Sequence, residues 1–286
     1  MKWSAGGRGN IEDRRGMGGV RGGGMSLGIG GILVLAVLSW ATGTDFLSLL
    51  GGGGPIGPAT ETAQPGEVAS SPAEERSVDF VNAVAGDAQD TWDALLGARY
   101  ERTVVVLFRD VVQSACGTAE SATGPFYCPA DHKVYLDLSF FDELDRRFGA
   151  PGDFAQAYVI AHEFGHHVQN LLGDNARVQR DRRTGPNSAS VALELQADCY
   201  AGVWGHEASK SGRFQAGKVE LEPGDAEEGL RAASAIGDDR LQKMGSGRVQ
   251  PEAFTHGSSA QRMEWFTRGL QSGDPRRCDA FAALTQ

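Results

Sequence analysis

The chain has 286 residues, of which 41% are hydrophobic, so it holds enough apolar material for one sizeable domain and additional segments. Its formal net charge is −10; residues 1–25 carry five basic and two acidic side chains, a net charge of +3, and the remainder therefore carries −13. A folded part with this acidic balance excludes the basic face that nucleic-acid binding needs, and we expect no nucleic-acid partner.

An apolar stretch follows the N-terminal tail. Residues 22–44 contain no charged side chain, and Ile29 to Ala41 is strongly apolar. About 20 apolar residues span a bilayer, so we expect one transmembrane helix within residues 26–50. Basic residues precede it, which favours a single-pass cell-membrane protein with a Gly/Arg-rich cytoplasmic tail, residues 1–25, and an extracytoplasmic remainder. A cleaved signal peptide is the alternative, because Ser39-Trp40-Ala41 has the small-x-small pattern of a cleavage site.

The remaining chain divides into a linker and a domain. Residues 51–76 are rich in Gly, Pro, Ala, Thr and Ser, which predicts a flexible tether, and the folded domain is expected at residues 77–286. Patterns along the domain predict one or two helices before Tyr100, a buried strand at Thr103 to Phe108, a second strand at Lys133 to Leu138 and a short helix at Phe140 to Phe148. We therefore expect an α+β fold, mainly helical with a small β-sheet.

A metal-binding pattern occupies the next helix. His162-Glu163-Phe164-Gly165-His166 is an H-E-x-x-H motif, which on a helix directs both imidazoles to one zinc ion and leaves Glu163 beside its open side as general base. A capping box formed by Asp153 and Gln156 is expected to begin this helix, and Gly173 to end it. The alternative, a buried helix that happens to carry these side chains, would leave costly polar groups on an apolar face.

A catalytic zinc usually has three protein ligands and one water, so a third ligand is required. His167 is rotated by about 100° from His166 and is unsuitable. The segment Ser188 to Lys210 offers Glu194 and Asp198, four residues apart on one helical face among apolar neighbours. We expect Glu194 to be the third ligand and Asp198 to accept the outer N–H of one histidine. A solvated face or an ion pair with a nearby arginine is the alternative.

Four cysteines and one further histidine complete the candidates. An even cysteine count outside the cytoplasm favours disulfides, and Cys116–Cys128 with Cys199–Cys278 is the simplest of three pairings; buried free thiols are the alternative. His256 precedes Ser258 and Gln261, which predict a capping box. It could stabilise the oxyanion of a tetrahedral intermediate or be an ordinary capping or surface histidine.

Several motifs together resemble a bacterial, membrane-anchored family of neutral zinc metallopeptidases. They are H-E-F-G-H-H-V-Q from His162, E-L-Q-A-D-C-Y-A-G-V-W from Glu194, Glu12 to Gly16, Gly124 to Pro129, Val134 to Phe141, and His256 to Arg262. The resemblance implies a zincin-like peptidase fold, and the E-x-x-A-D element is similar to that of gluzincins, whose third ligand is a glutamate on a second helix. It also implies that Val134 to Asp137 is the sheet edge on which a peptide lies; an ordinary internal strand is the alternative.

These features predict a membrane-tethered zinc metalloendopeptidase that acts on protein or peptide substrates. One zinc held by His162, His166 and Glu194 would activate a water whose proton Glu163 accepts and later passes to the leaving amine. Two alternatives are a non-hydrolytic membrane-anchored binding or assembly factor that keeps zinc structurally, and a zinc amidase that acts on cell-wall peptides.

Overall fold

A computed structural model describes residues 1–17, 68–181, 183–210, 212, 214 and 217–285. The predicted transmembrane helix, the last part of the predicted tail (residues 18–25) and most of the predicted linker (residues 51–67) fall outside these residues. Among the described residues, no helix has both the length and the apolar character needed to cross a bilayer.

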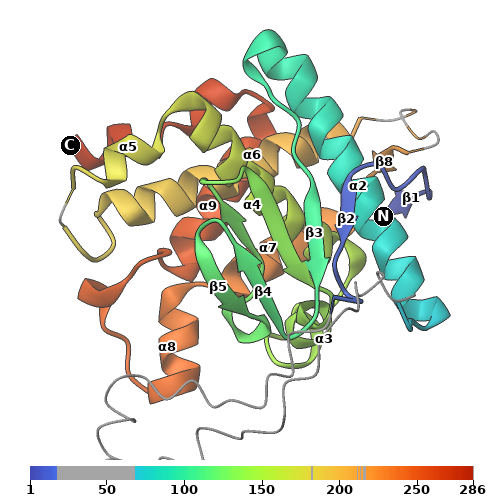
Figure 1. The fold of residues 1–286 in the computed structure, drawn as a ribbon. Coiled ribbons are helices and arrows are strands. Elements are labelled where there is room, and N and C mark those ends of the chain that lie inside the picture. Colours follow the sequence, from blue (N-terminus) through green and yellow to red (C-terminus); the bar gives the residue numbers. More distant parts are fainter. Residues whose placement is uncertain (18–67, 182, 211, 213, 215–216, 286) are drawn as a thin grey trace, which may run out of the picture. The chain divides into compact units, whose positions relative to one another are not determined.

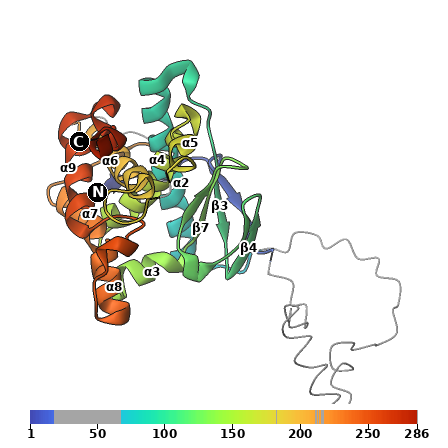
Figure 2. The ribbon, with the colours of Figure 1, turned by 90° about the vertical axis from the view of Figure 1, so that its left-hand side faces the viewer.

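The described part of the chain is α+β, as the sequence predicts. Its helices are α2 (Pro72–Leu96), α3 (Ser139–Arg146), α4 (Asp153–Leu172), α5 (Asn175–Val178), α6 (Ala189–Ala208), α7 (Asp225–Ala235), α8 (Asp238–Ser246) and α9 (Ser259–Ser272). Its strands are β1 (Lys2–Trp3), β2 (Ile11–Asp13), β3 (Val105–Phe108), β4 (Val111–Ser114), β5 (Gly117–Glu120), β6 (Phe126–Cys128), β7 (Lys133–Asp137) and β8 (Val219–Glu220). The helices lie on one side of the main sheet (Figures 1 and 2).

The main sheet has the order β2-β3-β7-β6, with parallel pairs β2–β3 and β3–β7 and an antiparallel pair β6–β7. The expectation that Val134 to Asp137 forms the sheet edge is therefore wrong. That segment is β7, an internal strand, because β6 pairs with its second side. The true edge beside β7 is Phe126 to Cys128, a three-residue strand too short to be recognised from alternation.

The first 16 residues belong to the same compact unit as residues 68–286. β2 pairs with β3, Ile11 opposite Val105, and the guanidinium of Arg15 is buried against Asp13, Glu74 and Glu75. These residues therefore do not form the separate tail that the sequence suggested. The single-pass topology, which would place these two segments on opposite sides of a membrane, stays a prediction.

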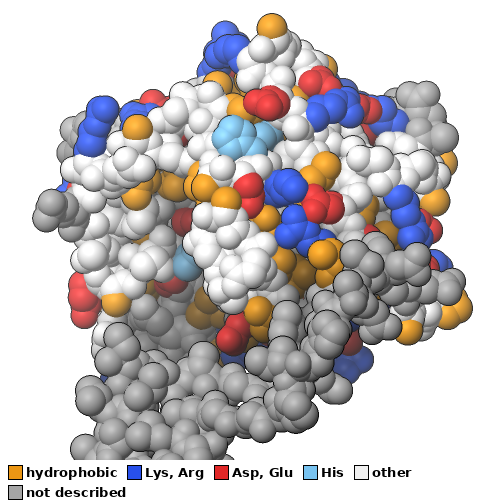
Figure 3. Space-filling view, viewed as in Figure 1, with side chains coloured by type: hydrophobic (Ala, Val, Ile, Leu, Met, Phe, Trp, Pro, Cys, Tyr) orange, Lys and Arg blue, Asp and Glu red, His pale blue; other side chains and the backbone are white. Residues whose placement is uncertain are grey.

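Ion pairs of this kind extend over the surface, where acidic and basic side chains lie next to one another with scattered hydrophobic ones (Figure 3). Arg8 pairs with Glu75 and Asp79 on α2, and Lys133 of β7 pairs with Glu12 of β2. The positive charge that suggested a cytoplasmic tail is thus partly used to fasten the N-terminal segment to the domain.

Close helix packing positions the central helices. A Cβ on Gly165 of α4 would lie 3.0 Å from both the Cα and the carbonyl oxygen of Ala197 on α6, and a Cβ on Gly269 of α9 would lie 1.9 Å from the carbonyl oxygen of Cys199 on α6. Only glycine permits these approaches. α4, α6 and α9 consequently form a tight stack, with α6 in the middle.

Two disulfides stabilise the fold in the pairing that the sequence favoured. Cys116–Cys128 joins the β4–β5 turn to β6, and Cys199–Cys278 joins α6 to the segment after α9. No cysteine is free. The second bridge closes a loop with a sequence separation of 79 residues, which in the chain-entropy model stabilises the folded state by about 4 kcal/mol.

Candidate metal centre

α4 carries the H-E-x-x-H motif in the centre of the domain. The helix ends at Gly173 in the left-handed conformation, as predicted, but its expected capping box is wrong. Gly152 is the N-cap, and Asp153 is already the first helical residue. The backbone N–H of Phe154 donates instead to Glu228 of α7 at 3.1 Å, so a distant element replaces the local cap.

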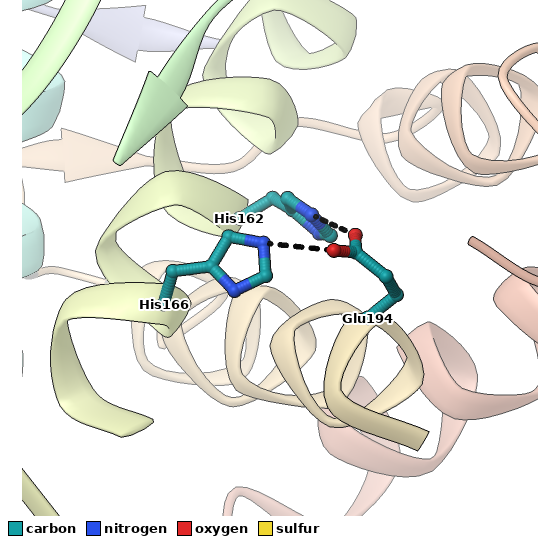
Figure 4. Close-up of side chains that lie close together, drawn as sticks. All are labelled: His162, His166 and Glu194. Atoms are coloured by element: carbon teal, nitrogen blue, oxygen red, sulfur yellow. Dashed lines mark hydrogen bonds and ion pairs between the residues drawn. The ribbon is translucent and has the colours of Figure 1, made fainter. Parts of the chain in front are cut away.

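Three predicted ligands converge on one point between α4 and α6 (Figure 4). The Nε2 atom of His162 lies 3.2 Å from one carboxylate oxygen of Glu194, and the Nε2 atom of His166 lies 3.5 Å from the other. Ligand atoms about 2.0–2.1 Å from a tetrahedral zinc lie about 3.4 Å apart. The three side chains therefore fit zinc, both in their donor atoms and in their spacing, and they leave the fourth position open.

The histidines are oriented from behind by residues of α4 and α6. Nδ1–H of His162 donates to Asp198 at 2.9 Å, which is the role expected for Asp198. Nδ1 of His166 lies 2.8 Å from the side-chain oxygen of Gln169, whose amide group donates to the backbone of Leu193 on α6. Each imidazole thus turns Nε2 towards Glu194, as metal-binding histidines require.

Asp198 is held by two groups that the sequence did not identify, although an ion pair with an unspecified arginine was the alternative for this face. Arg262 of α9 donates to both Asp198 carboxylate oxygens at 2.8 Å, and the hydroxyl of Tyr158 donates to one of them at 2.5 Å. All three side chains are buried. Tyr158 lies one turn before His162 on α4, and Arg262 is a single charge on an otherwise apolar helix face; these were the available sequence signals.

The buried charged side chains of this cluster shift one another's pKa values. Burial raises the pKa of Asp198, but Arg262 and His162 outweigh it and hold the pKa at about 2. Burial also raises the pKa of Glu194, yet the two histidines keep it well below its usual range. Burial lowers the pKa of His162, whereas Asp198 and Glu194 raise it, to about 9. The carboxylates therefore stay ionised and favour a cation between them.

Glu163 and His256 line the same cavity as the three ligands, whereas His132, His167 and His206 do not. The cavity has a volume of about 930 Å³ and apolar walls that include Phe126, Phe140 and Val159. His167 faces away, bonded to the Tyr127 hydroxyl and the Glu101 carbonyl, as its rotation on the helix predicted. His206 contacts the Leu270 carbonyl at the end of α6.

A second group of carboxylates, Asp153, Asp225 and Glu228, lies at the start of α4. The Met1 ammonium is 3.3 Å from Asp153 and 3.2 Å from Asp225. A positive charge of the chain thus already occupies this group and offsets part of its negative charge.

Comparison with known proteins agrees with the motifs. The family model described as "Putative neutral zinc metallopeptidase" matches residues 1–281. The chain belongs to this family. The match includes the N-terminal strands, so the zinc metallopeptidase family shares the segment that packs on the domain.

Relatives match between 71% and 95% of the chain. The chain is 44% identical to the uncharacterized protein YpfJ of Escherichia coli (strain K12), with 95% of each chain covered. It is 48% identical over 207 residues to the uncharacterized protein Rv2575 of Mycobacterium tuberculosis, covering 71% of this chain and 70% of that one. No solved structure matches the chain significantly. The family therefore implies zinc and a peptidase, and its relatives add no substrate.

Proposed function

We propose that the protein is a zinc metalloendopeptidase that hydrolyses peptide bonds in proteins or peptides. The observation that carries the proposal is the convergence of His162, His166 and Glu194 on one point, beside Glu163 and within an open cavity. A structural zinc site is usually closed by four protein ligands, whereas three ligands with an open position are typical of a catalytic site. This favours hydrolysis over a non-hydrolytic binding role.

The chain's residues divide the chemistry between them. Zinc in this position would supply a Lewis acid that activates water and polarises a carbonyl. Glu163 accepts a proton from the attacking water and later passes it to the leaving amine, so one carboxylate serves both proton transfers. His256 lines the same cavity from the loop before α9, and it donates a hydrogen bond to the carbonyl oxygen as that oxygen gains negative charge.

The edge strand β6 supports a peptide substrate. Phe126 and Tyr127 of β6 line the cavity, and β6 is the last strand of the main sheet, with β7 on its other side. An extended peptide can add to such an edge through main-chain hydrogen bonds. Attachment to a membrane through residues 26–50 is a separate proposal, which rests on their apolar composition.

The experiment is to incubate the full-length protein with a complex peptide library and to identify new termini by mass spectrometry. We expect cleaved α-peptide bonds in the presence of zinc, loss of cleavage with a chelator, and its return when zinc is restored. An absence of peptide cleavage by zinc-loaded protein would overturn the proposal. Cleavage of cell-wall fragments alone would replace it with the amidase alternative.

A further inference from the structure

The first residue of α8 fastens the loop that carries His256. One carboxylate oxygen of Asp238, Oδ2, accepts the backbone N–H groups of Thr255, His256 and Gly257 at 2.7, 2.6 and 3.0 Å. The backbone N–H of Asp238 donates to the carbonyl of Gly257 at 2.9 Å. Asp238 is 7% exposed, so these bonds fix its side chain as well as the loop.

The other oxygen of Asp238 faces the imidazole of His256. Oδ1 of Asp238 lies 3.3 Å from Nδ1, and the hydroxyl oxygen of Thr255 lies 2.9 Å from the same nitrogen. With Nδ1 engaged in this way, Nε2 is the nitrogen left for a ligand in the cavity that His256 lines. The bond to Asp238 raises the pKa of His256, and partial desolvation of this half-exposed ring opposes the shift; the net result favours the form with protons on both nitrogens.

We propose that Asp238 is a positioning residue that holds His256 as a hydrogen-bond donor, through Nε2, to the carbonyl oxygen of a peptide bound in the cavity. The inference rests on the proposed peptidase function and names a residue outside the zinc-binding helices. A charged donor stabilises a developing oxyanion more strongly than a neutral one, so the effect belongs to the transition state.

Asp238→Asn separates this role from the fastening of the loop. The asparagine oxygen can still accept the three backbone N–H groups, but an amide –NH2 replaces the oxygen that accepts from Nδ1. We expect zinc content, thermal unfolding and KM close to those of wild type, and kcat about tenfold lower. ¹⁵N spectra of the imidazole recorded over a range of pH should show a higher pKa for His256 in wild type than in the variant.

Two further variants complete the design. Asp239→Asn is the matched control, because the Asp239 carboxylate accepts from the backbone N–H and the hydroxyl of Ser259, at 2.7 and 2.8 Å, and does not hold the His256 ring; it should leave kcat unchanged. In a protein that already carries His256→Gln, the further change Asp238→Asn should lower kcat only slightly, because the two substitutions remove the same interaction.

The proposal is overturned if Asp238→Asn folds and keeps the wild-type kcat. It is also overturned if the fold-loss of kcat in the double variant equals the product of the fold-losses in Asp238→Asn and His256→Gln. An unchanged kcat in His256→Gln, with wild type active, would likewise overturn it. A wild-type protein that cleaves no peptide would instead refute the proposed function. In that case the ¹⁵N spectra would still decide whether Asp238 sets the protonation of His256.

Discussion

The guanidinium of Arg262 lies side-on to the carboxylate of Asp198, with Nε donating to Oδ2 and Nη2 to Oδ1, each at 2.8 Å. The pair links α9 to the helix that carries Glu194, directly behind His162. Because Asp198 is fully buried, its charge needs a permanent counter-charge, which Arg262 supplies.

Removal of Arg262 should therefore be costly. Arg262→Met leaves a buried carboxylate without its counter-charge, and we expect the free energy of unfolding to fall by about 3–5 kcal/mol, with weaker zinc binding. Chemical denaturation and a zinc titration would measure the two effects. Arg268→Met, on the same helix but in an exposed pair with Glu264, is the control and should change stability by less than about 1 kcal/mol. Equal effects in the two variants would contradict the account.

The close approach of α4 and α6 should depend on Gly165. A methyl group there would lie 3.0 Å from two backbone atoms of Ala197, so Gly165→Ala must push Glu194 away from the histidines. We expect a loss of about 1–3 kcal/mol in stability and weaker zinc binding. Gly245→Ala in α8, where an added Cβ meets nothing within 4 Å, should instead stabilise by up to about 1 kcal/mol. The same sign in both variants would refute the packing argument.

The stability of the metal-free protein should fall as the pH rises. The pKa of His162 is raised from an unfolded value near 6.5 to about 9, so its stabilising proton is fully present below pH 6.5 and is lost as the pH passes 9. Chelator-treated protein should lose about 3 kcal/mol between these values relative to His162→Gln. Urea unfolding at both pH values measures the difference. If the stability of wild type and of His162→Gln depends on pH in the same way, His162 does not hold the stabilising proton.

The N-terminal segment and the domain should lie on the same side of any membrane. Gly7→Cys and Gly245→Cys place thiols where an added Cβ meets nothing within 4 Å, and the native cysteines are all paired. In intact cells, a membrane-impermeant maleimide should label both positions or neither, because strands that share hydrogen bonds lie on one side of a membrane. Labelling of only one position is the result that the single-pass arrangement predicts, and it would contradict the pairing of β2 with β3.

Local patterns were sufficient for the central helices. The 3.6-residue spacing of apolar side chains predicted α4 and α6, and it placed His162, His166 and Glu194 on facing surfaces. The capping-box pattern predicted the start of α9. The pairing of β2 with β3 was not predictable in this way, because Ile11 and Val105 are 94 positions apart in the sequence. The same holds for Arg262 and Asp238, whose partners come from other elements. The three-residue β6 was too short for any period to be visible.

The central claim is that zinc held by His162, His166 and Glu194 serves a reaction in which Glu163 transfers the proton. The most direct test measures zinc content and peptide cleavage on the same preparations of wild type, Glu163→Gln and His162→Ala. We predict one zinc per chain in wild type and Glu163→Gln, little zinc in His162→Ala, and cleavage by wild type alone. Cleavage by Glu163→Gln at the wild-type rate, or a full zinc complement in His162→Ala, would contradict the account.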